Sequence, residues 1–347
     1  MHRRNKILPA LLLFLASYLY CVPANCENIY QAVLNEDYFP ALVKLITGAK
    51  RSIRLVGLSF DSVKNPGKKI VSLLIEAAAR GVDVNIFLEG DHGFAAKKNR
   101  ATLAGFWATG VKARADSKSR ITHCKLLIVD DNYVLLGSTN LTRNSMIFNN
   151  EANFLIKSAD AGFFFRKFFN SIWNHPYKQP ALKLASRDNE SIFFSGLKFF
   201  VYTSNVIDRA TAEINLMMYM IKKDDGLLVH KLLDKLIAAH RRGVKVKLFL
   251  EQSGPKAFNA HIHRFNNEAV DYLKKAGITD IVFDSPKQLT HSKILIADNK
   301  AVLIGSNNWF EKGIISHRQI GVLTTNHGAV SAMKLYFERL FNQYKKK

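Results

Sequence analysis

One pattern of polar residues occurs twice in this chain, once in each half. It reads HCKLLIVDDNYVLLGSTN at 123–140 and HSKILIADNKAVLIGSNN at 291–308, and both copies fit H-x-K-x4-D-x6-G-S-x-N without a gap. A single H-x-K is common by chance, whereas six fixed positions repeated at identical spacing are not. Imidazole groups can act as nucleophile, acid or base, and ammonium and amide groups can donate to an anionic oxygen. The repeat therefore predicts one active site built from both halves.

The double pattern resembles the HKD signature of the phospholipase D superfamily, whose members cut or exchange phosphate esters without a metal ion. The resemblance implies a single composite site between two similar halves, with the following catalytic residues: His123, Lys125, Asn140, His291, Lys293 and Asn308. We expect no cofactor and no metal site, because the sequence contains no H-E-x-x-H motif, no C-x2-C pair and no acidic cluster typical of a metal cage.

The chemistry implied by this resemblance needs all of these groups. Two lysines and two asparagines would surround one phosphate with donors and neutralise its negative charge. One imidazole would attack phosphorus to give a phosphohistidine. The other would protonate the leaving oxygen and then deprotonate the incoming water or alcohol.

The two copies differ fourteen residues after the motif glycine, where the first half has Glu151 and the second has Gln319. Members of the family carry an acidic or amide residue near this place that orients a motif histidine. A carboxylate raises the basicity of the imidazole, whereas an amide orients it without adding charge. With Glu151 as the partner of His123, we predict His123 as the nucleophile and His291 as the general acid and base. The alternative is that both are ordinary polar strand residues.

The remaining motif positions are assigned to orientation or structure. Asp130 and Asp298 start turns after short buried strands, five residues past the motif lysines, so we expect them to lie away from the phosphate. This interpretation departs from a catalytic His-Lys-Asp triad. Ser138 and Ser306 belong to the Gly-Ser-x-Asn corners that follow the second strand of each motif.

The elements that must position these residues are also repeated. IVSLLIEAAARGVDVNIFLE at 70–89 matches LLDKLIAAHRRGVKVKLFLE at 232–251, and in both a helical apolar pattern changes to strand alternation after Arg-Gly. Gly81 and Gly243 are placed to end the helix with a left-handed cap. Helix and strand alternate, so each half is expected to be a sheet flanked by helices.

These repeats predict an α/β fold of two halves, 25–180 and 190–347, with a junction near 176–190 that is rich in proline and polar residues. The resemblance implies α/β/α sandwich halves related by a pseudo-two-fold axis. The phenylalanine stripe at 163–169 is expected to lie buried between the halves. Trp309 and Phe310 either form a wall for a leaving group or fill the core, and we favour the core. Cys124 points away from His123 in a strand and is expected to be a core thiol.

The N-terminus and the charge bear on partners and location. Residues 1–24 combine a basic start, a short apolar run and small residues before the expected cleavage site, which is typical of a secretory signal peptide. The formal net charge is +22, and removing Arg3, Arg4 and Lys6 with this segment leaves +19. Such an excess favours an anionic membrane surface, nucleic acid or phosphate-rich head groups as partners.

These observations are compatible with three functions. The first, which we favour, is an exported phospholipase D-like phosphodiesterase, periplasmic or secreted and monomeric, that hydrolyses or transfers the phosphatidyl group of phospholipids or another phosphodiester through a phosphohistidine. The second is a metal-independent, sequence-tolerant endonuclease of the same superfamily, which the basic charge suits. The third is a non-catalytic polyanion-binding protein, which the intact pair of motifs disfavours because binding alone does not require two histidines.

Overall fold

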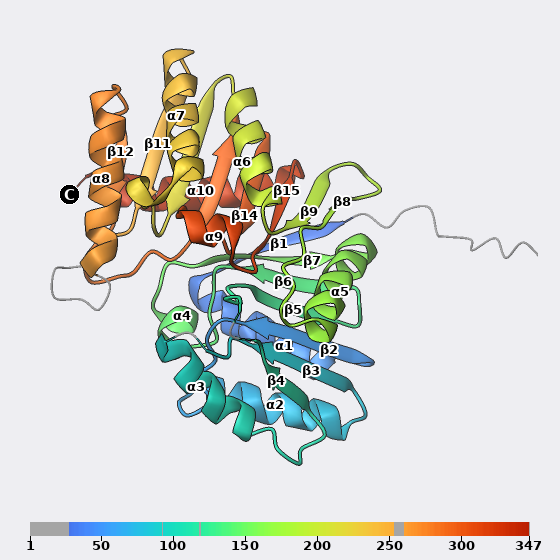
Figure 1. Ribbon diagram of the computed structural model, residues 1–347. Coiled ribbons are helices and arrows are strands. Elements are labelled where there is room, and N and C mark those ends of the chain that lie inside the picture. Colours follow the sequence, from blue (N-terminus) through green and yellow to red (C-terminus); the bar gives the residue numbers. More distant parts are fainter. Residues whose placement is uncertain (1–27, 92, 118, 253–259, 347) are drawn as a thin grey trace, which may run out of the picture.

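The computed structural model describes residues 28–91, 93–117, 119–252 and 260–346. The expected signal peptide at 1–24 lies outside these ranges. Two mixed sheets, each with helices packed on it, are stacked one above the other in Figure 1, which agrees with the predicted α/β halves. In the described part of the chain, no helix combines the length and the apolar character needed to cross a membrane.

The first sheet has the strand order β1-β7-β6-β5-β2-β3-β4, with β2, β3 and β4 parallel and the other neighbours antiparallel. Its strands are β1 Ile29–Leu34, β2 Ser52–Gly57, β3 Asp83–Leu88, β4 Lys112–Ala115, β5 Lys125–Val129, β6 Tyr133–Gly137 and β7 Ala152–Lys157. The helices of this half are η1 Asn35–Asp37, α1 Tyr38–Gly48, α2 Gly67–Ala79, α3 Gly93–Ala104, α4 Arg143–Ile147 and α5 Ala159–Asn174.

The second sheet has the order β12-β11-β10-β13-β14-β15-β9-β8. Its strands are β8 Lys183–Ala185, β9 Ser191–Ser195, β10 Glu213–Met218, β11 Lys245–Leu250, β12 Ile281–Phe283, β13 Lys293–Ala297, β14 Ala301–Gly305 and β15 Ile320–Thr324. The helices are α6 Lys198–Arg209, η2 Lys223–Asp225, α7 Leu227–Arg241, α8 Ala260–Lys275, α9 Glu311–Ile315 and α10 His327–Lys345. The segment at 176–190, expected as a junction, contains β8, which pairs with β9 and so belongs to the second sheet.

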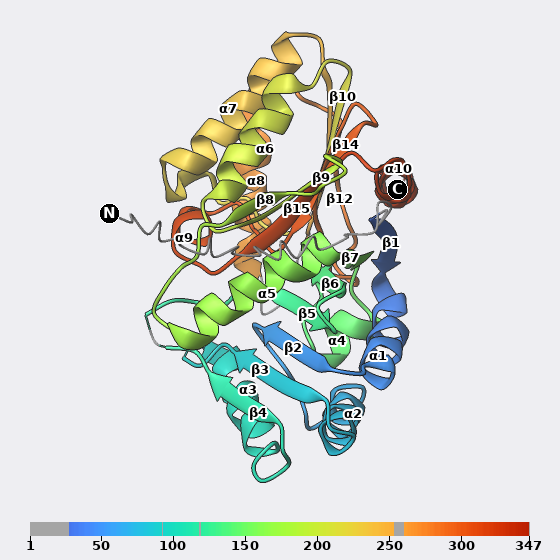
Figure 2. The same cartoon turned by 90° about the vertical axis from the view of Figure 1, so that its right-hand side faces the viewer.

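Local signals place these elements as expected. Gly81 and Gly243 follow α2 and α7 with φ of 87° and 90°, so both helices end in the left-handed conformation that glycine adopts without a Cβ clash. Figure 2 shows α5 lying between the two sheets. Its phenylalanines at 164, 165, 168 and 169 are buried in one core with side chains of both halves, whereas Phe163 is 51% exposed. The stripe is thus buried between the halves on one face only.

Candidate active site

The two motif histidines lie where the halves meet. Each lies two residues before the start of a strand, β5 or β13, that runs antiparallel to the first parallel strand of its half. Backbone bonds then cross the interface. The His123 amide donates to the Arg318 carbonyl (3.0 Å), and the His291 amide donates to the Asn150 carbonyl (2.9 Å). Arg318 and Asn150 directly precede Gln319 and Glu151. Each motif histidine is therefore paired through its backbone with the residue that precedes Gln319 or Glu151 in the other half.

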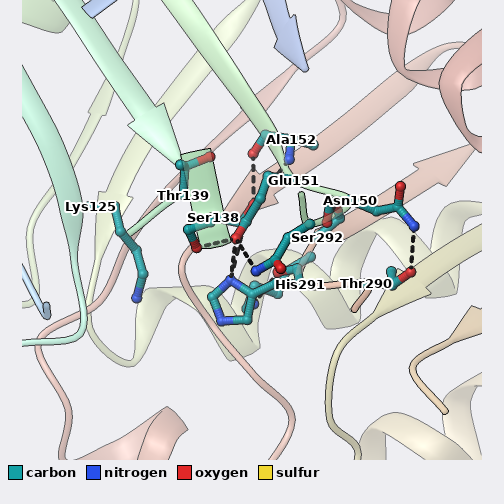
Figure 3. A network of polar contacts seen from close by, with 12 residues as sticks. Lys125, Ser138, Thr139, Asn150, Glu151, Ala152, Thr290, His291 and Ser292 are labelled. Atoms are coloured by element: carbon teal, nitrogen blue, oxygen red, sulfur yellow. Dashed lines mark hydrogen bonds and ion pairs between the residues drawn. The ribbon is translucent and has the colours of Figure 1, made fainter. Parts of the chain in front are cut away.

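This backbone pairing exchanges the orienting residues between the histidines. Glu151 contacts His291, with 3.1 and 3.0 Å from its two carboxylate oxygens to Nδ1 (Figure 3). Gln319 contacts His123, with 3.1 Å from Oε1 to Nδ1. The expected pairing of Glu151 with His123 is therefore wrong. Glu151 and Gln319 each follow the glycine of their own motif by fourteen residues. Because the halves pair at the interface, however, each side chain contacts the histidine of the other motif.

Glu151 is buried, and its carboxylate is saturated with donors. The hydroxyls of Ser138 and Ser145 each donate to it at 2.5 Å, and Asn149 Nδ2 does so at 3.3 Å. Burial by itself would raise the pKa of this carboxyl, but the charge and hydrogen bond of His291 and the charge of Lys293 lower it. Glu151 is therefore an anion that accepts the Nδ1 proton of His291.

Gln319 fixes His123 without adding charge. Ser306 Oγ donates to Gln319 Oε1 (2.7 Å), in the same arrangement that Ser138 makes with Glu151. His123 Nδ1 lies 3.0 Å from the Ser306 carbonyl as well as 3.1 Å from Gln319 Oε1. These two acceptors lie closer to Nδ1 than the donor Lys125 Nζ at 3.4 Å, so Nδ1 carries the proton and Nε2 is left for chemistry.

Burial acts on the pKa of both imidazoles. It lowers the pKa of His291 to about 4, with Glu151 opposing the shift. It also lowers the pKa of His123 well below its usual value, and the charge of Lys125 adds to this. Both rings are therefore neutral near pH 7. An anionic phosphodiester bound between them would raise both pKa values, because opposite charge favours the protonated ring.

The motif lysines are almost completely buried beside the histidines. Lys125 Nζ donates to the His123 carbonyl at 2.7 Å, and Lys293 Nζ donates to the His291 carbonyl. Burial lowers the pKa of Lys125 to about 7 and that of Lys293 well below its usual value. Two buried lysine side chains this close together would bind an anion well, because the anion raises their pKa values and keeps both amino groups protonated.

Asn140 and Asn308 lie in the corners that follow β6 and β14. The Oδ1 atom of each is buried and has no hydrogen-bond partner among the described residues. Buried side-chain amides normally have hydrogen-bond partners, so these two are available to a ligand. The structure thus brings both motif histidines and both motif lysines close together at the interface and places the two asparagines in the corners of the same motifs.

Asp130 and Asp298 lie at the opposite ends of their strands from the histidines. Asp130 accepts the backbone amides of residues 50, 51 and 52 at 2.7–2.9 Å. Asp298 accepts those of residues 211, 212 and 213 at 2.8–3.0 Å. Each carboxylate holds the chain that enters the neighbouring strand, as expected of a structural residue and not of a triad member.

A pair of buried acids behind each histidine was missed from the sequence. The backbone amide of Thr122, which precedes His123, donates to Glu89 (2.6 Å), and its hydroxyl donates to Asp116 (2.6 Å). In the second half, the backbone amide of Thr290 donates to Glu251 and Asp284. Glu89 and Glu251 end the repeated segments 70–89 and 232–251, so the repeat itself was the signal that could have found them.

The first acid pair also receives an arginine from the other half. Arg318 is fully buried and donates to Asp116 (2.8 Å), to the Lys178 carbonyl (2.9 Å) and to the Pro176 carbonyl. Burial still raises the pKa of Asp116 to about 7. The corresponding residue in the first half is Asn150, which donates to the Thr290 hydroxyl at 3.0 Å.

Different rings flank the two histidines. Tyr219 packs edge-on against His291 with ring centroids 4.9 Å apart. His317 lies 6.2 Å from His123, and Phe310 lies 5.1 Å from His317. Trp309 is buried in the core as expected, whereas Phe310 is only partly buried, so the prediction of a core position is wrong for the second residue.

Cys124 is a core thiol, as expected. Its side chain is fully buried, and Sγ donates to the Arg318 carbonyl at 3.0 Å. Burial raises the pKa of the thiol to about 12, so it is not a nucleophile near neutral pH.

Comparisons with known proteins agree on one family. The model of the family described as cardiolipin synthase, PLD-like domain, matches residues 42–173 and 204–341. Cardiolipin synthase B of Salmonella typhi is 30% identical over 115 residues, which is 33% of this chain and 27% of that protein. Phospholipase D of Rickettsia felis is 32% identical over 108 residues, which is 31% of this chain and 46% of that protein. The alignments thus span less than half of each of these two relatives.

A solved structure shares the fold. The crystal structure of phosphatidylserine synthase of Haemophilus influenzae superposes with a TM-score of 0.74 at 11% sequence identity, covering 91% of this chain and 86% of that one. At this identity the similarity concerns the fold alone.

Proposed function

Because this chain belongs to the phospholipase D superfamily, we propose that it is an exported phosphodiesterase that hydrolyses or transfers the phosphatidyl group of phospholipids. The observation that carries the mechanism is the pairing of His291 with a carboxylate and of His123 with an amide. Export is supported by the pattern of residues 1–24. The phospholipid substrate is supported by relatives named cardiolipin synthase B and phospholipase D.

The pairing assigns the roles opposite to those expected from the sequence. Glu151 accepts the Nδ1 proton of His291, which leaves the Nε2 lone pair free and stabilises positive charge on the ring as it attacks phosphorus. Gln319 holds His123 without such stabilisation, so His123 gives up its proton more readily. His291 is therefore the nucleophile and His123 the general acid and base.

The reaction then proceeds in two displacements. His291 Nε2 bonds to phosphorus while the bond to the head-group oxygen breaks, and that oxygen takes the proton from the His123 imidazolium. In the second step water or an alcohol gives its proton to His123 and attacks phosphorus, and the bond to His291 breaks. Lys125, Lys293 and the amides of the two motif asparagines stabilise charge on the remaining phosphate oxygens.

Locating the adduct tests the assignment of roles. His123→Ala protein mixed with a nitrophenyl phosphodiester should form the phosphohistidine on His291 and then stall, because this leaving group needs no acid. His291→Ala protein should form no adduct. Mass spectrometry of the quenched reaction identifies the modified residue, and His327→Ala, an exposed histidine at the start of α10, is the control. Phosphate found on His123 would reverse the roles.

A nuclease is the second candidate, favoured by the net charge of +22. Purified protein assayed on phosphatidylcholine, phosphatidylglycerol and single-stranded DNA separates the two functions. With phospholipid as substrate, a primary alcohol should divert product from phosphatidic acid to a phosphatidyl alcohol, since both acceptors compete for one phosphohistidine. Rapid degradation of DNA together with intact lipid vesicles would favour the nuclease.

A further inference from the structure

Three linked differences between the halves occur beside His123. The first half has Thr142, Ser145 and Asn149, and at the same spacing from the motif the second half has Phe310, Gly313 and His317. In the first half Glu151 accepts the Ser145 hydroxyl and the Asn149 amide, and the Thr142 hydroxyl caps α4 by accepting the Ser145 backbone amide. The second half replaces those donors with two rings and a glycine.

The glycine makes room for the rings. A Cβ atom built on Gly313 would lie 2.4 Å from Cε1 of Phe310, so no other residue lets this ring lie against α9. The Phe310 ring in turn packs against His317 at 5.1 Å with an interplanar angle of 75°. His317 is 8% exposed and lies 6.2 Å from His123. Phe310, Gly313 and His317 therefore form one packed group beside His123, the proposed general acid, and the rings of Phe310 and His317 make a wall there.

The position of this wall relates it to the reaction. If His291 attacks phosphorus, the leaving oxygen departs on the opposite side, next to His123, because the attacking and leaving atoms are in line. The incoming alcohol must use the same place, since His123 serves as acid for one step and base for the other. Resting on the proposed function, we propose that His317 and Phe310 form the subsite for the alcohol that leaves and the alcohol that enters.

The charges at this place define the class of alcohol. His123 is held by the amide of Gln319, whereas the carboxylate of Glu151 is engaged by His291. Asp116 is bound by Arg318 behind Thr122, and Glu311, which follows Phe310 in the chain, accepts the Leu228 amide. An ammonium head group would thus meet the positive charge that a bound phosphate restores to Lys125. An uncharged hydroxyl group can hydrogen-bond to His317 while the C–H atoms of the alcohol pack on Phe310, so the subsite selects alcohols that carry a second hydroxyl group over those that carry an ammonium group.

A competition between two small acceptors tests this selectivity. Micelles of phosphatidyl-p-nitrophenol supply the adduct, and ethylene glycol and ethanolamine compete for it at equal concentration near pH 7. These acceptors match in size and differ by a hydroxyl against an ammonium group. The product ratio reports the subsite alone, because both products arise from the same phosphohistidine.

We expect the wild-type protein to favour ethylene glycol by roughly tenfold, the difference that one hydrogen bond and one unfavourable charge provide. His317→Asn, which installs the side chain of the first half, should bring the ratio down by roughly fivefold or more. Phe310→Leu should reduce it by less, and the exposed His327→Asn should not change it.

The outcomes separate the two proposals. Equal use of both acceptors by the wild-type protein, or a ratio unmoved by both His317→Asn and Phe310→Leu while nitrophenol is still released, would overturn the subsite and leave the phosphodiesterase intact. Failure of the wild-type protein to release nitrophenol would overturn the proposed function and this inference with it. Circular dichroism verifies the fold of each variant.

Discussion

The first half of the molecule holds its histidine against an amide from the second half, whereas the second half holds its histidine against a carboxylate from the first. The supporting framework is nevertheless shared. Asn99 and Asn266 bind equivalent backbone groups of the two halves, each accepting from one amide and donating to two carbonyls. Residues that repeat in both halves therefore build the site, and residues that differ between the halves divide the roles within it.

The largest effect is expected from removing the carboxylate that distinguishes the halves. Glu151→Gln should lower turnover by roughly 10³–10⁴-fold, because His291 loses the anion that stabilises its imidazolium and fixes its tautomer. Steady-state kinetics measure this loss. Gln319→Glu, the matched change on the other side, should lower turnover less, since it only makes His123 a weaker acid.

The double variant Glu151→Gln and Gln319→Glu tests whether the carboxylate decides which histidine attacks. It exchanges the charges while keeping both hydrogen bonds, so the nitrophenyl adduct should move from His291 to His123. Mass spectrometry locates the phosphate. An adduct that stays on His291 would show that the carboxylate does not decide which imidazole attacks.

The next largest effect is expected on the free energy of unfolding when Arg318, which has no arginine counterpart in the first half, is replaced. Arg318→Met removes the ion-pair partner of Asp116, which typically costs about 3–5 kcal/mol when measured above pH 7, where the Asp116 carboxyl is ionised. The counterpart Asn150→Ala removes a single hydrogen bond and should cost about 1 kcal/mol. Chemical denaturation compares the two, and an equal loss in both variants would contradict the importance of the ion pair.

The same acid gives the wild-type protein a defined pH dependence. Burial raises the pKa of Asp116 to about 7, above the value of about 3.9 in an unfolded chain. The folded state therefore binds more protons between these values, and this group lowers the free energy of unfolding as the pH rises from about 4 to 7. Asp116→Asn should flatten that part of the profile of unfolding free energy against pH.

A smaller effect is expected at the aspartates that both halves share. Asp130→Asn and Asp298→Asn keep the size of the side chain but weaken its bonds to three backbone amides, so each should cost about 1–3 kcal/mol of stability. Turnover measured below the unfolding transition should be retained. A collapse of turnover comparable to that of Glu151→Gln would restore these aspartates to the catalytic set.

The smallest effect should come from a chelator. The proposed phosphate donors are lysine and asparagine side chains, and no group of three or more potential metal ligands (His, Cys, Asp or Glu) occurs among the described residues. Phosphodiesterase activity should therefore persist in excess EDTA. Complete loss that a divalent ion restores would contradict the proposed mechanism.

Local spacing along the chain was sufficient to predict several parts of the molecule. The repeated motif identified the family and the two histidine–lysine pairs that meet at the interface, because alternation along a strand places His123 and Lys125 on one face. Helical periodicity followed by Gly81 and Gly243 defined the helix-to-strand turns. The turn positions of Asp130 and Asp298 indicated that these residues lie away from the histidines.

The partner of each histidine depends on contacts between the two folded halves. Glu151 and His291 are 140 residues apart, and their contact depends on backbone pairing across the interface, which no local periodicity encodes. The same holds for Arg318, whose partners at 116, 176 and 178 belong to the other half and to the junction. The ring of Phe310 became part of the site because Gly313 leaves space for it on α9. Spacing along the chain fixes which face a side chain lies on, but contacts between distant segments fix what it meets there.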